Sequence, residues 1–189
     1  WKVHRISLAA AIRLLPFFIL SGLAAGWTIW EQKFNSGAIG EAWNQTLPER
    51  FAIAGRVIWF YLGKLAWPEP LIFIYPRWEI RGTDPLVYLG LAVAIGVAVA
   101  LWRGRNGRLR PVFFAGVYFV ALLFPILGFF SVYFFRYSFV GDHFQYLASM
   151  GPLALAAAGL SQLPARLPLI LGGAVALALT WSTALHSRV

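Results

Sequence analysis

Long stretches of the chain carry no charged residue, and their spacing predicts membrane-spanning helices. The hydrocarbon core of a bilayer is about 30 Å thick and an α-helix rises about 1.5 Å per residue, so a span needs roughly 20 apolar residues. Uncharged runs near this length or longer predict spans at residues 14–30, 85–102, 111–135, 146–163 and 167–185. The predicted fold class is therefore all-α, a polytopic transmembrane helix bundle of about five spans.

Two of these runs need interpretation. The run at 111–135 is longer than a span requires, so the helix tilts, kinks at Pro125, or continues beyond the membrane with its aromatic residues at the interface. The run at 14–30 follows basic residues, as the apolar part of a signal peptide does. It is too long for one, however, and Trp27 and Trp30 stand where a cleavage site needs small residues, so we interpret it as a span.

A sixth apolar segment, residues 51–67, contains Arg56 and Lys64. A cation at the centre of a membrane helix costs about 3 kcal/mol on insertion scales. The distribution of charge along the chain decides whether this segment crosses. With the N-terminus in the cytoplasm and only the uncharged runs crossing, the N-terminal segment (+3), the loop 103–110 (+4) and Arg166 (+1) lie inside, and all seven acidic residues lie outside.

If residues 51–67 also crossed, the loop with four arginines would lie outside, against the positive-inside tendency. The segment is therefore predicted to be an external interfacial or re-entrant helix. The same reasoning predicts a multi-pass protein whose N-terminus is cytoplasmic.

Composition supports a membrane environment. Apolar residues make up 60% of the 189 residues and charged residues only 12%, whereas soluble domains have about 25% charged residues. The net charge of +9 does not indicate nucleic-acid binding, because the basic residues lie at the ends of apolar runs rather than along one face. The chain has no cysteine and no clustered histidines, so we expect no metal site.

The external segments carry the candidate chemistry. Arg77 and Arg81 are either interfacial arginines whose charged ends reach water, or ligands of a phosphate group. In the second segment, Asp142 either caps the following helix or pairs with Arg136, or else Asp142 or His143 binds a substrate or positions a lipid phosphate. Catalytic signatures such as a glycine-rich phosphate loop or a nucleophile elbow are absent from the sequence.

The stretch Asp142-His143-Phe144-Gln145-Tyr146-Leu147, followed by Met150-Gly151, resembles an Asp-Arg-Tyr-x-Tyr-Leu-type sequence of bacterial membrane proteins with C-terminal tetratricopeptide repeats. Those proteins are similar to the transmembrane and tetratricopeptide-repeat O-mannosyltransferases of the GT-C glycosyltransferase class. Residues 47–80 also resemble the middle region of that family, with Trp67-Pro68 at the end of a helix and Tyr75-Pro76 after it. Residues 181–189 resemble the segment that leads into the first repeat.

The resemblance implies a protein of the bacterial inner membrane that transfers a sugar from a polyprenyl-phosphate carrier to an extracytoplasmic protein acceptor. It implies a substrate or lipid-phosphate site made of Arg77, Arg81, Arg136, Asp142, His143 and Tyr146. His143 and Phe144 depart from the Arg and Tyr usual in the family. The family's catalytic base belongs to an external loop upstream of Trp1, and its repeats follow Val189, so we expect a fragment that is inactive alone and holds no cofactor.

Two other classes of function fit the sequence. A non-catalytic membrane anchor for a tetratricopeptide-repeat domain would have the same spans without the acidic base. A transporter would place charged residues within its spans and would show inverted repeats, and the uncharged runs argue against this.

Overall fold

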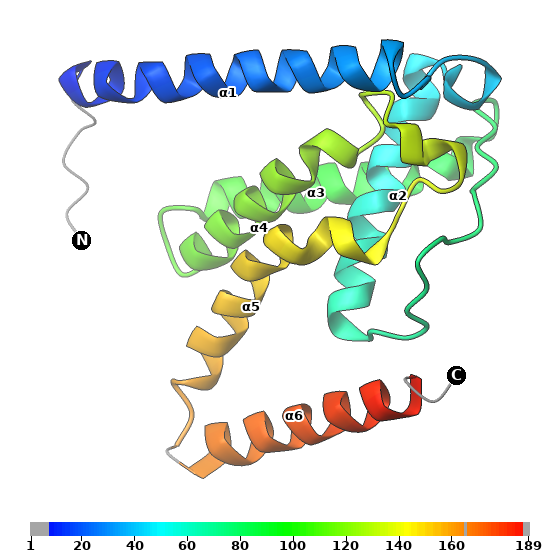
Figure 1. Cartoon of the computed structure of the whole chain (residues 1–189). Coiled ribbons are helices and arrows are strands. Elements are labelled where there is room, and N and C mark those ends of the chain that lie inside the picture. Colours follow the sequence, from blue (N-terminus) through cyan, green and yellow to red (C-terminus); the bar gives the residue numbers. More distant parts are fainter. Residues whose placement is uncertain (1–7, 165, 187–189) are drawn as a thin grey trace. The chain divides into compact units, whose positions relative to one another are not determined.

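The computed structural model describes residues 8–164 and 166–186, and the regular structure in these ranges is entirely helical (Figure 1). The α-helices are α1 (Leu8–Phe34), α2 (Leu47–Ala66), α3 (Leu89–Gly104), α4 (Arg110–Leu123), α5 (Tyr146–Leu160) and α6 (Arg166–His186). Short 3₁₀ turns lie between them: η1 (Glu41–Trp43), η2 (Pro85–Tyr88), η3 (Phe124–Ile126), η4 (Tyr133–Arg136) and η5 (Asp142–Gln145). The predicted all-α class is confirmed for the part of the chain that the structure describes.

Three helical segments in these ranges are long and apolar enough to cross a membrane: Ile12–Phe34, Pro85–Gly104 and Arg166–Ala184. They correspond to the predicted spans at 14–30, 85–102 and 167–185. Their most apolar parts bury no residue within the chain, as expected for helices that meet lipid rather than a protein core.

The predicted spans at 111–135 and 146–163 do not form helices of this length. α4 ends at Leu123, and Pro125 lies in η3, because a proline lacks the N–H and crowds the carbonyl four residues earlier. α5 has 15 residues, so it is about 23 Å long and shorter than the hydrocarbon core of a typical bilayer. The 25-residue run is therefore not one helix, and the structure establishes three candidate spans rather than five.

The segment predicted as a helix at 51–67 is α2, and it is not among the helices that could span. A capping box starts it, since the Thr46 backbone N–H donates to the Glu49 carboxylate at 2.8 Å. Glu49 has a lowered pKa, chiefly because of this hydrogen bond. The helix ends one residue before Trp67, whose conformation is extended ahead of Pro68.

The chain divides into two compact units. The first contains the residues up to Gly96 and Leu123–Gln145, and the second contains Val97–Leu122 and the residues from Tyr146 onward. In the first, α2 packs against the start of α3, where Trp59 donates from Nε1 to the Gly90 carbonyl at 2.8 Å. Gly55 allows this approach, because a Cβ atom there would collide with the backbone of Leu91.

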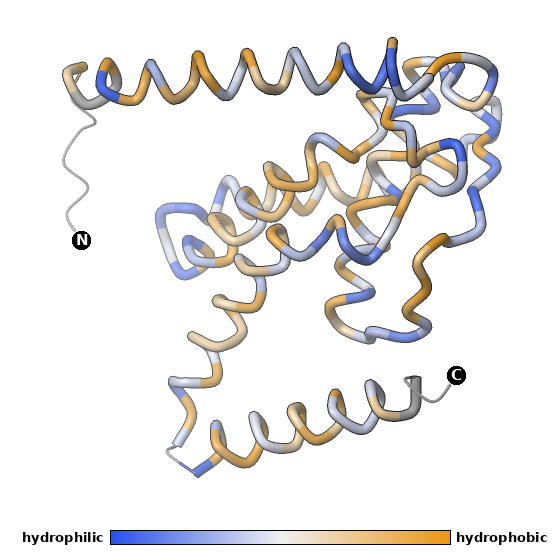
Figure 2. The backbone as a smooth tube through the Cα atoms, viewed as in Figure 1, coloured by the Kyte–Doolittle hydropathy of each residue, from blue (hydrophilic) through white to orange (hydrophobic). Residues whose placement is uncertain are grey.

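The second unit contains the hairpin formed by the later part of α3 with α4, and a close contact of α4 with α5. The rings of Trp102 and Phe113 meet edge to face at 5.7 Å beside the connection of the hairpin. A Cβ atom at Gly151 of α5 would lie 2.7 Å from Cδ1 of Tyr118, so only glycine permits this helix contact. Hydrophilic residues gather in the α3–α4 connection, between apolar helices (Figure 2).

Candidate functional site

The first unit contains an ordered assembly of α2 with the two segments 67–84 and 124–145, which we call the platform. Its core includes fully buried side chains from α2 and from the second segment: Ile53, Val57, Tyr61, Phe135, Ser138 and Val140. This burial packs the irregular backbone of the second segment against the helix, and Tyr75 is the buried residue of the first segment. The platform therefore fixes the positions of the polar groups that these segments carry.

Tyr75 and Asp142 meet in the platform. The Tyr75 hydroxyl donates to the Asp142 carboxylate, with Oδ1 at 2.9 Å and Oδ2 at 3.1 Å. Tyr75 is buried, and burial raises its pKa to about 12, with the hydrogen bond to Asp142 acting in the same direction. The phenol therefore stays protonated and serves as a fixed donor to the carboxylate.

The Pro70 carbonyl oxygen also lies 2.8 Å from the Tyr75 hydroxyl, but a phenol has one hydrogen to donate. The Lys64 ammonium donates to the same Pro70 carbonyl and satisfies it. The Tyr75 hydrogen is therefore available to Asp142. Lys64, Pro70, Tyr75 and Asp142 form one continuous polar chain that begins on α2.

Lys64 is buried, and no carboxylate in the described part of the chain forms an ion pair with it. Its ammonium lies over two aromatic rings, 5.6 Å from the centroid of Phe60 and 5.1 Å from that of Tyr75. The faces of aromatic rings and the oxygen of a carbonyl carry partial negative charge, and this charge stabilises the cation in place of an anion. The lysine that appeared in the sequence as a charge in an apolar helix thus contributes to the interior of the platform.

Tyr61 fixes the backbone beside Asp142. Its hydroxyl donates to the Gly141 carbonyl at 3.1 Å and accepts from the Gly141 N–H at 3.1 Å. Burial raises the pKa of Tyr61, so the hydroxyl stays protonated and can make both bonds. Gly141 is itself buried, and a Cβ atom there would lie 3.1 Å from the His143 ring. This packing sets the direction in which Asp142 leaves the backbone.

Each of the three predicted arginines has different interaction partners. Arg77 donates to the Ala42 carbonyl, with its guanidinium 5.0 Å from the centroid of the Phe139 ring. Arg81 pairs with Glu79 at 3.9 Å, and both side chains are exposed, so this pair contributes little stability. Arg136 is exposed near Tyr133, whose pKa is lowered chiefly by its hydrogen bond with Tyr137 and further by the charge of Arg136.

Asp142 does not pair with Arg136. No hydrogen bond or ion pair in the described ranges joins Asp142 to any of the predicted arginines, and its partner is Tyr75. Asp142 is also the first residue of η5 rather than a cap in front of α5. Of the interpretations open from the sequence, a binding or positioning role in the platform remains a prediction.

The remaining predicted residues differ in their surroundings. His143 is exposed and stacks on Phe73, with ring centroids 5.6 Å apart and planes 21° from parallel. Tyr146 begins α5 in the second unit and is 68% exposed, so the platform does not include it. Within the described ranges, no three histidine or acidic side chains are close enough to hold a metal ion.

Arg50 was not singled out from the sequence, yet it connects two loops of the first unit. Its guanidinium donates to the carbonyls of Gln45 (3.1 Å), Trp43 (3.0 Å), Gly128 (2.7 Å) and Phe129 (3.2 Å). The planar fork of arginine suits several acceptors at once. Arg50 lies in the first turn of α2, between two irregular loops. An arginine at such a position can bind carbonyls of both loops, and sequence reasoning missed this signal.

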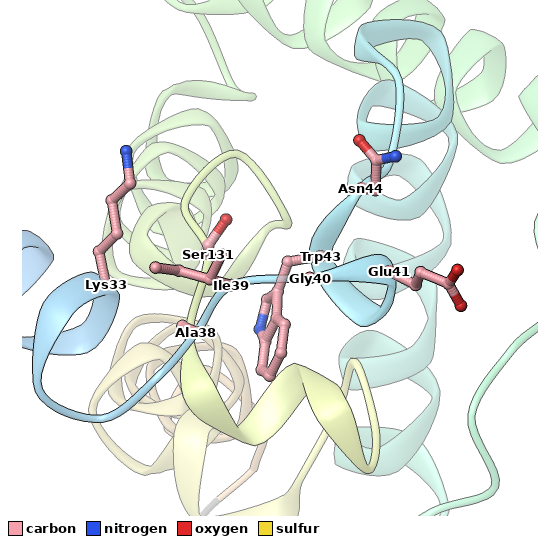
Figure 3. Close-up of a pocket in the computed structure, with 8 residues that line it drawn as sticks. All are labelled: Lys33, Ala38, Ile39, Gly40, Glu41, Trp43, Asn44 and Ser131. Atoms are coloured by element: carbon pink, nitrogen blue, oxygen red, sulfur yellow. The ribbon is translucent and has the colours of Figure 1, made fainter.

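A shallow pocket of about 390 Å³ lies beside η1 and is lined by Lys33, Ala38, Ile39, Gly40, Glu41, Trp43, Asn44 and Ser131 (Figure 3). The side chains of Lys33, Glu41 and Asn44 point in different directions in Figure 3. Trp43 is anchored by a 2.8 Å hydrogen bond from its Nε1 to the Val132 carbonyl. The polar groups do not converge on a common point. We therefore interpret the pocket as a space between packed loops.

Comparison of the chain with protein-family models, with curated proteins and with solved structures found no match. The fold and the site define the class: a helical membrane protein that carries an ordered, aromatic-rich polar platform.

Proposed function

We propose that this chain is the membrane-embedded part of a GT-C-like glycosyltransferase, resembling the protein O-mannosyltransferases, in the bacterial inner membrane. The parent protein moves a sugar from a polyprenyl-phosphate carrier to an extracytoplasmic protein acceptor. One observation carries the proposal. The two segments whose sequences resemble that family, one with Tyr75-Pro76 and one beginning at Asp142, are joined by the Tyr75–Asp142 hydrogen bond.

The proposed role of the platform is to bind the carrier phosphate. A leaving polyprenyl phosphate carries negative charge, and guanidinium groups stabilise such charge with paired N–H donors. Arg136 is the foremost candidate, because it is exposed and makes no ion pair with an acidic residue within the described ranges. Arg77 and Arg81 are secondary candidates, and Asp142 positions the segment on which Arg136 lies. The base that activates the acceptor hydroxyl belongs to a part of the parent outside this chain.

The proposal includes five spans, with the N-terminus in the cytoplasm and α2 on the external side. α4 with η3, and α5, then cross as short helices, and a bilayer adapts to short helices by local thinning. The close contact of Gly151 with Tyr118 supports pairing of these two helices. Charge supports the orientation, since the four arginines of 103–110 lie inside and the acidic residues outside.

A non-catalytic anchor for tetratricopeptide repeats is the second candidate. The observation that favours it is that Arg77 and Arg81 already have partners, in Ala42 and Glu79, so neither guanidinium is free of protein contacts. An anchor needs the platform only as a rigid support. The two candidates therefore differ in whether the platform binds a lipid phosphate.

The discriminating experiment measures binding of farnesyl phosphate, a short polyprenyl monophosphate, to the whole chain in phosphatidylcholine nanodiscs. Farnesol is the uncharged comparison ligand. The enzyme proposal expects tighter binding of farnesyl phosphate, weakened about tenfold or more by Arg136→Gln, because a hydrogen bond to a charged group contributes about 1.5–3 kcal/mol. Arg103→Gln, which removes one charge from α3, should leave binding unchanged. Equal binding of farnesol and farnesyl phosphate would instead favour the anchor.

A further inference from the structure

A second polar region lies in the second unit, at the connection between α3 and α4. A pocket of about 440 Å³ is lined there by Trp102, Arg105, Asn106, Arg110, Phe113 and Phe114. The volume is within the usual range of ligand pockets. Two arginines and three aromatic rings thus surround one cavity at the end of an apolar helix.

The two arginines are held by the aromatic residues. The guanidinium of Arg105 lies 3.8 Å from the centroid of the Trp102 ring and donates to the Trp102 carbonyl at 2.7 Å. The guanidinium of Arg110 lies 5.9 Å from the centroid of the Phe114 ring. An arginine has five N–H donors, so most of those on Arg105 remain available to a ligand. Stacking orients the guanidinium groups and lowers the conformational entropy that binding must remove.

The positive charge of this connection is not neutralised by the protein. Residues 103–110 contain four arginines and no acidic residue. None of these arginines forms an ion pair with a carboxylate within the described ranges. The nearest acidic residues in the sequence are Asp84 and Asp142. An anion from outside the chain is the remaining way to compensate the charge.

The position of the pocket selects the kind of anion. It lies where Pro85–Gly104, one of the three segments able to cross a membrane, ends. The end of a span lies at the level of the lipid headgroups, where tryptophan is also favoured. Basic pockets between membrane helices at this level bind anionic headgroups. We propose that Arg105 and Arg110 form a binding site for the phosphodiester of an anionic phospholipid, with Trp102, Phe113 and Phe114 contacting its glycerol and upper acyl chains.

The proposal concerns different residues from the platform and does not depend on glycosyl transfer. It also does not depend on which side of the membrane the connection faces, because the test uses nanodiscs with the same lipids in both leaflets. The whole chain is placed in nanodiscs of phosphatidylcholine and phosphatidylglycerol in equal amounts. Native mass spectrometry then measures how much of each lipid the released protein retains.

Two double variants remove the same charge from the same loop. Arg105→Gln with Arg110→Gln changes the two arginines that line the pocket, and Arg103→Gln with Arg108→Gln changes the two that do not. We expect the first variant to lower the preference for phosphatidylglycerol on the order of tenfold or more, because it removes charge-assisted hydrogen bonds to the phosphodiester. The second should change it by less than about threefold, since exposed charges that make no direct contact contribute little. An equal loss in both variants would overturn the proposal.

Two further measurements separate the remaining explanations. Arg105→Lys with Arg110→Lys keeps both charges, so it should retain most of the preference; a loss as large as that of the Gln variant would show that charge is not the cause and would overturn the proposal. Inorganic phosphate in excess tests the source of the anion. We expect it to leave phosphatidylglycerol bound, because it lacks the acyl chains, and its displacement of the lipid would show a site for free phosphate instead.

Discussion

The hydroxyl of Tyr75 donates to the carboxylate of Asp142 at 2.9 Å, although 67 residues separate the two in the chain. The contact joins the segment that leaves α2 to the segment that precedes α5. Because Lys64 satisfies the neighbouring Pro70 carbonyl, the phenol hydrogen is directed to Asp142. The polar chain through these residues links two segments that contain no α-helix.

Removing either side chain of this pair should destabilise the first unit. Tyr75→Phe keeps the ring and its edge-to-face contact with Phe60, but leaves Asp142 without its phenol donor. We expect a loss of about 1.5–3 kcal/mol in the free energy of unfolding, the usual contribution of a hydrogen bond to a charged group. Combining it with Asp142→Asn in a double-mutant cycle should give a coupling energy of at least about 0.5 kcal/mol.

Denaturant unfolding in detergent micelles, followed by helix content, measures these free energies. Tyr137→Phe is the matched control, because the Tyr137 side chain is exposed and its hydroxyl is 3.5 Å from that of Tyr133. It should change stability by less than about 0.5 kcal/mol. A coupling energy near zero for Tyr75 and Asp142 would contradict the role assigned to the pair.

Alkaline pH should weaken the platform through the same tyrosine. The pKa of Tyr75 is raised from its ordinary value of 10 to about 12, so the folded state holds a proton that the unfolded state has lost. Stability is therefore fully present below pH 10 and falls as pH rises toward 12. Ultraviolet titration of tyrosinate in the native chain measures this, with Tyr75→Phe as the comparison.

In that titration, the wild-type chain should show one more high-pKa tyrosine than Tyr75→Phe. Asp142→Asn should lower the pKa of Tyr75, because it removes the carboxylate that favours the protonated phenol, while burial continues to raise it. If the titration of the Asp142→Asn variant matches that of the wild type, the hydrogen bond has no influence on the phenol.

The sequence predicted the parts of the fold that depend on composition and periodicity. Uncharged runs identified three helical segments long enough to cross a membrane, formed by α1, by η2 with α3, and by α6. The helix predicted at 51–67 is α2, but it begins earlier, at Leu47 after the cap Thr46. The run at 111–135 was misleading, since hydropathy does not distinguish a helix from the apolar loop that follows Pro125. Apolar residues there enter the core of the platform, as buried Phe135 shows.

The site was less predictable for a different reason. Asp142 was identified, and Arg136 was one of the partners left open for it, because sequence reasoning considers charges that are close in the chain. The actual partner, Tyr75, depends on how two long loops fold over α2. Lys64 likewise was recognised as a charge in an apolar helix, and only the fold shows that a carbonyl and two rings surround it.

Arg50 should be required to hold the loops 37–46 and 127–132 together. Arg50→Lys retains the positive charge but has a single ammonium in place of a fork, so it cannot reach the carbonyls of Trp43 and Gly128 together. Buried carbonyls left unpaired cost about 1–3 kcal/mol each. We expect faster amide hydrogen exchange and proteolysis in residues 37–46 and 127–132.

Arg56→Lys is the control for Arg50→Lys. The Arg56 guanidinium lies 4.3 Å from the centroid of the Trp78 ring and is exposed, and a lysine can also place a cation over that ring. Exchange in both loops should then match the wild type. If Arg50→Lys also matches the wild type, the four carbonyl contacts do not hold the loops.

The proposed orientation makes a further prediction, which single cysteines in this cysteine-free chain test directly. Gly141 is a poor position, because it is buried and a Cβ atom there would lie 3.1 Å from the His143 ring. Thr83 is exposed in the platform, and Gly107 is exposed in the α3–α4 connection with no atom closer than 3.7 Å to an added Cβ. A membrane-impermeant maleimide applied to intact cells should label Thr83→Cys and not Gly107→Cys, and both should react after permeabilisation.

Labelling of Gly107→Cys alone in intact cells would place the four arginines outside and the platform inside. The external polyprenyl-phosphate site would then be wrong, whereas the phospholipid site, which depends only on the end of a span, would remain open to its own test.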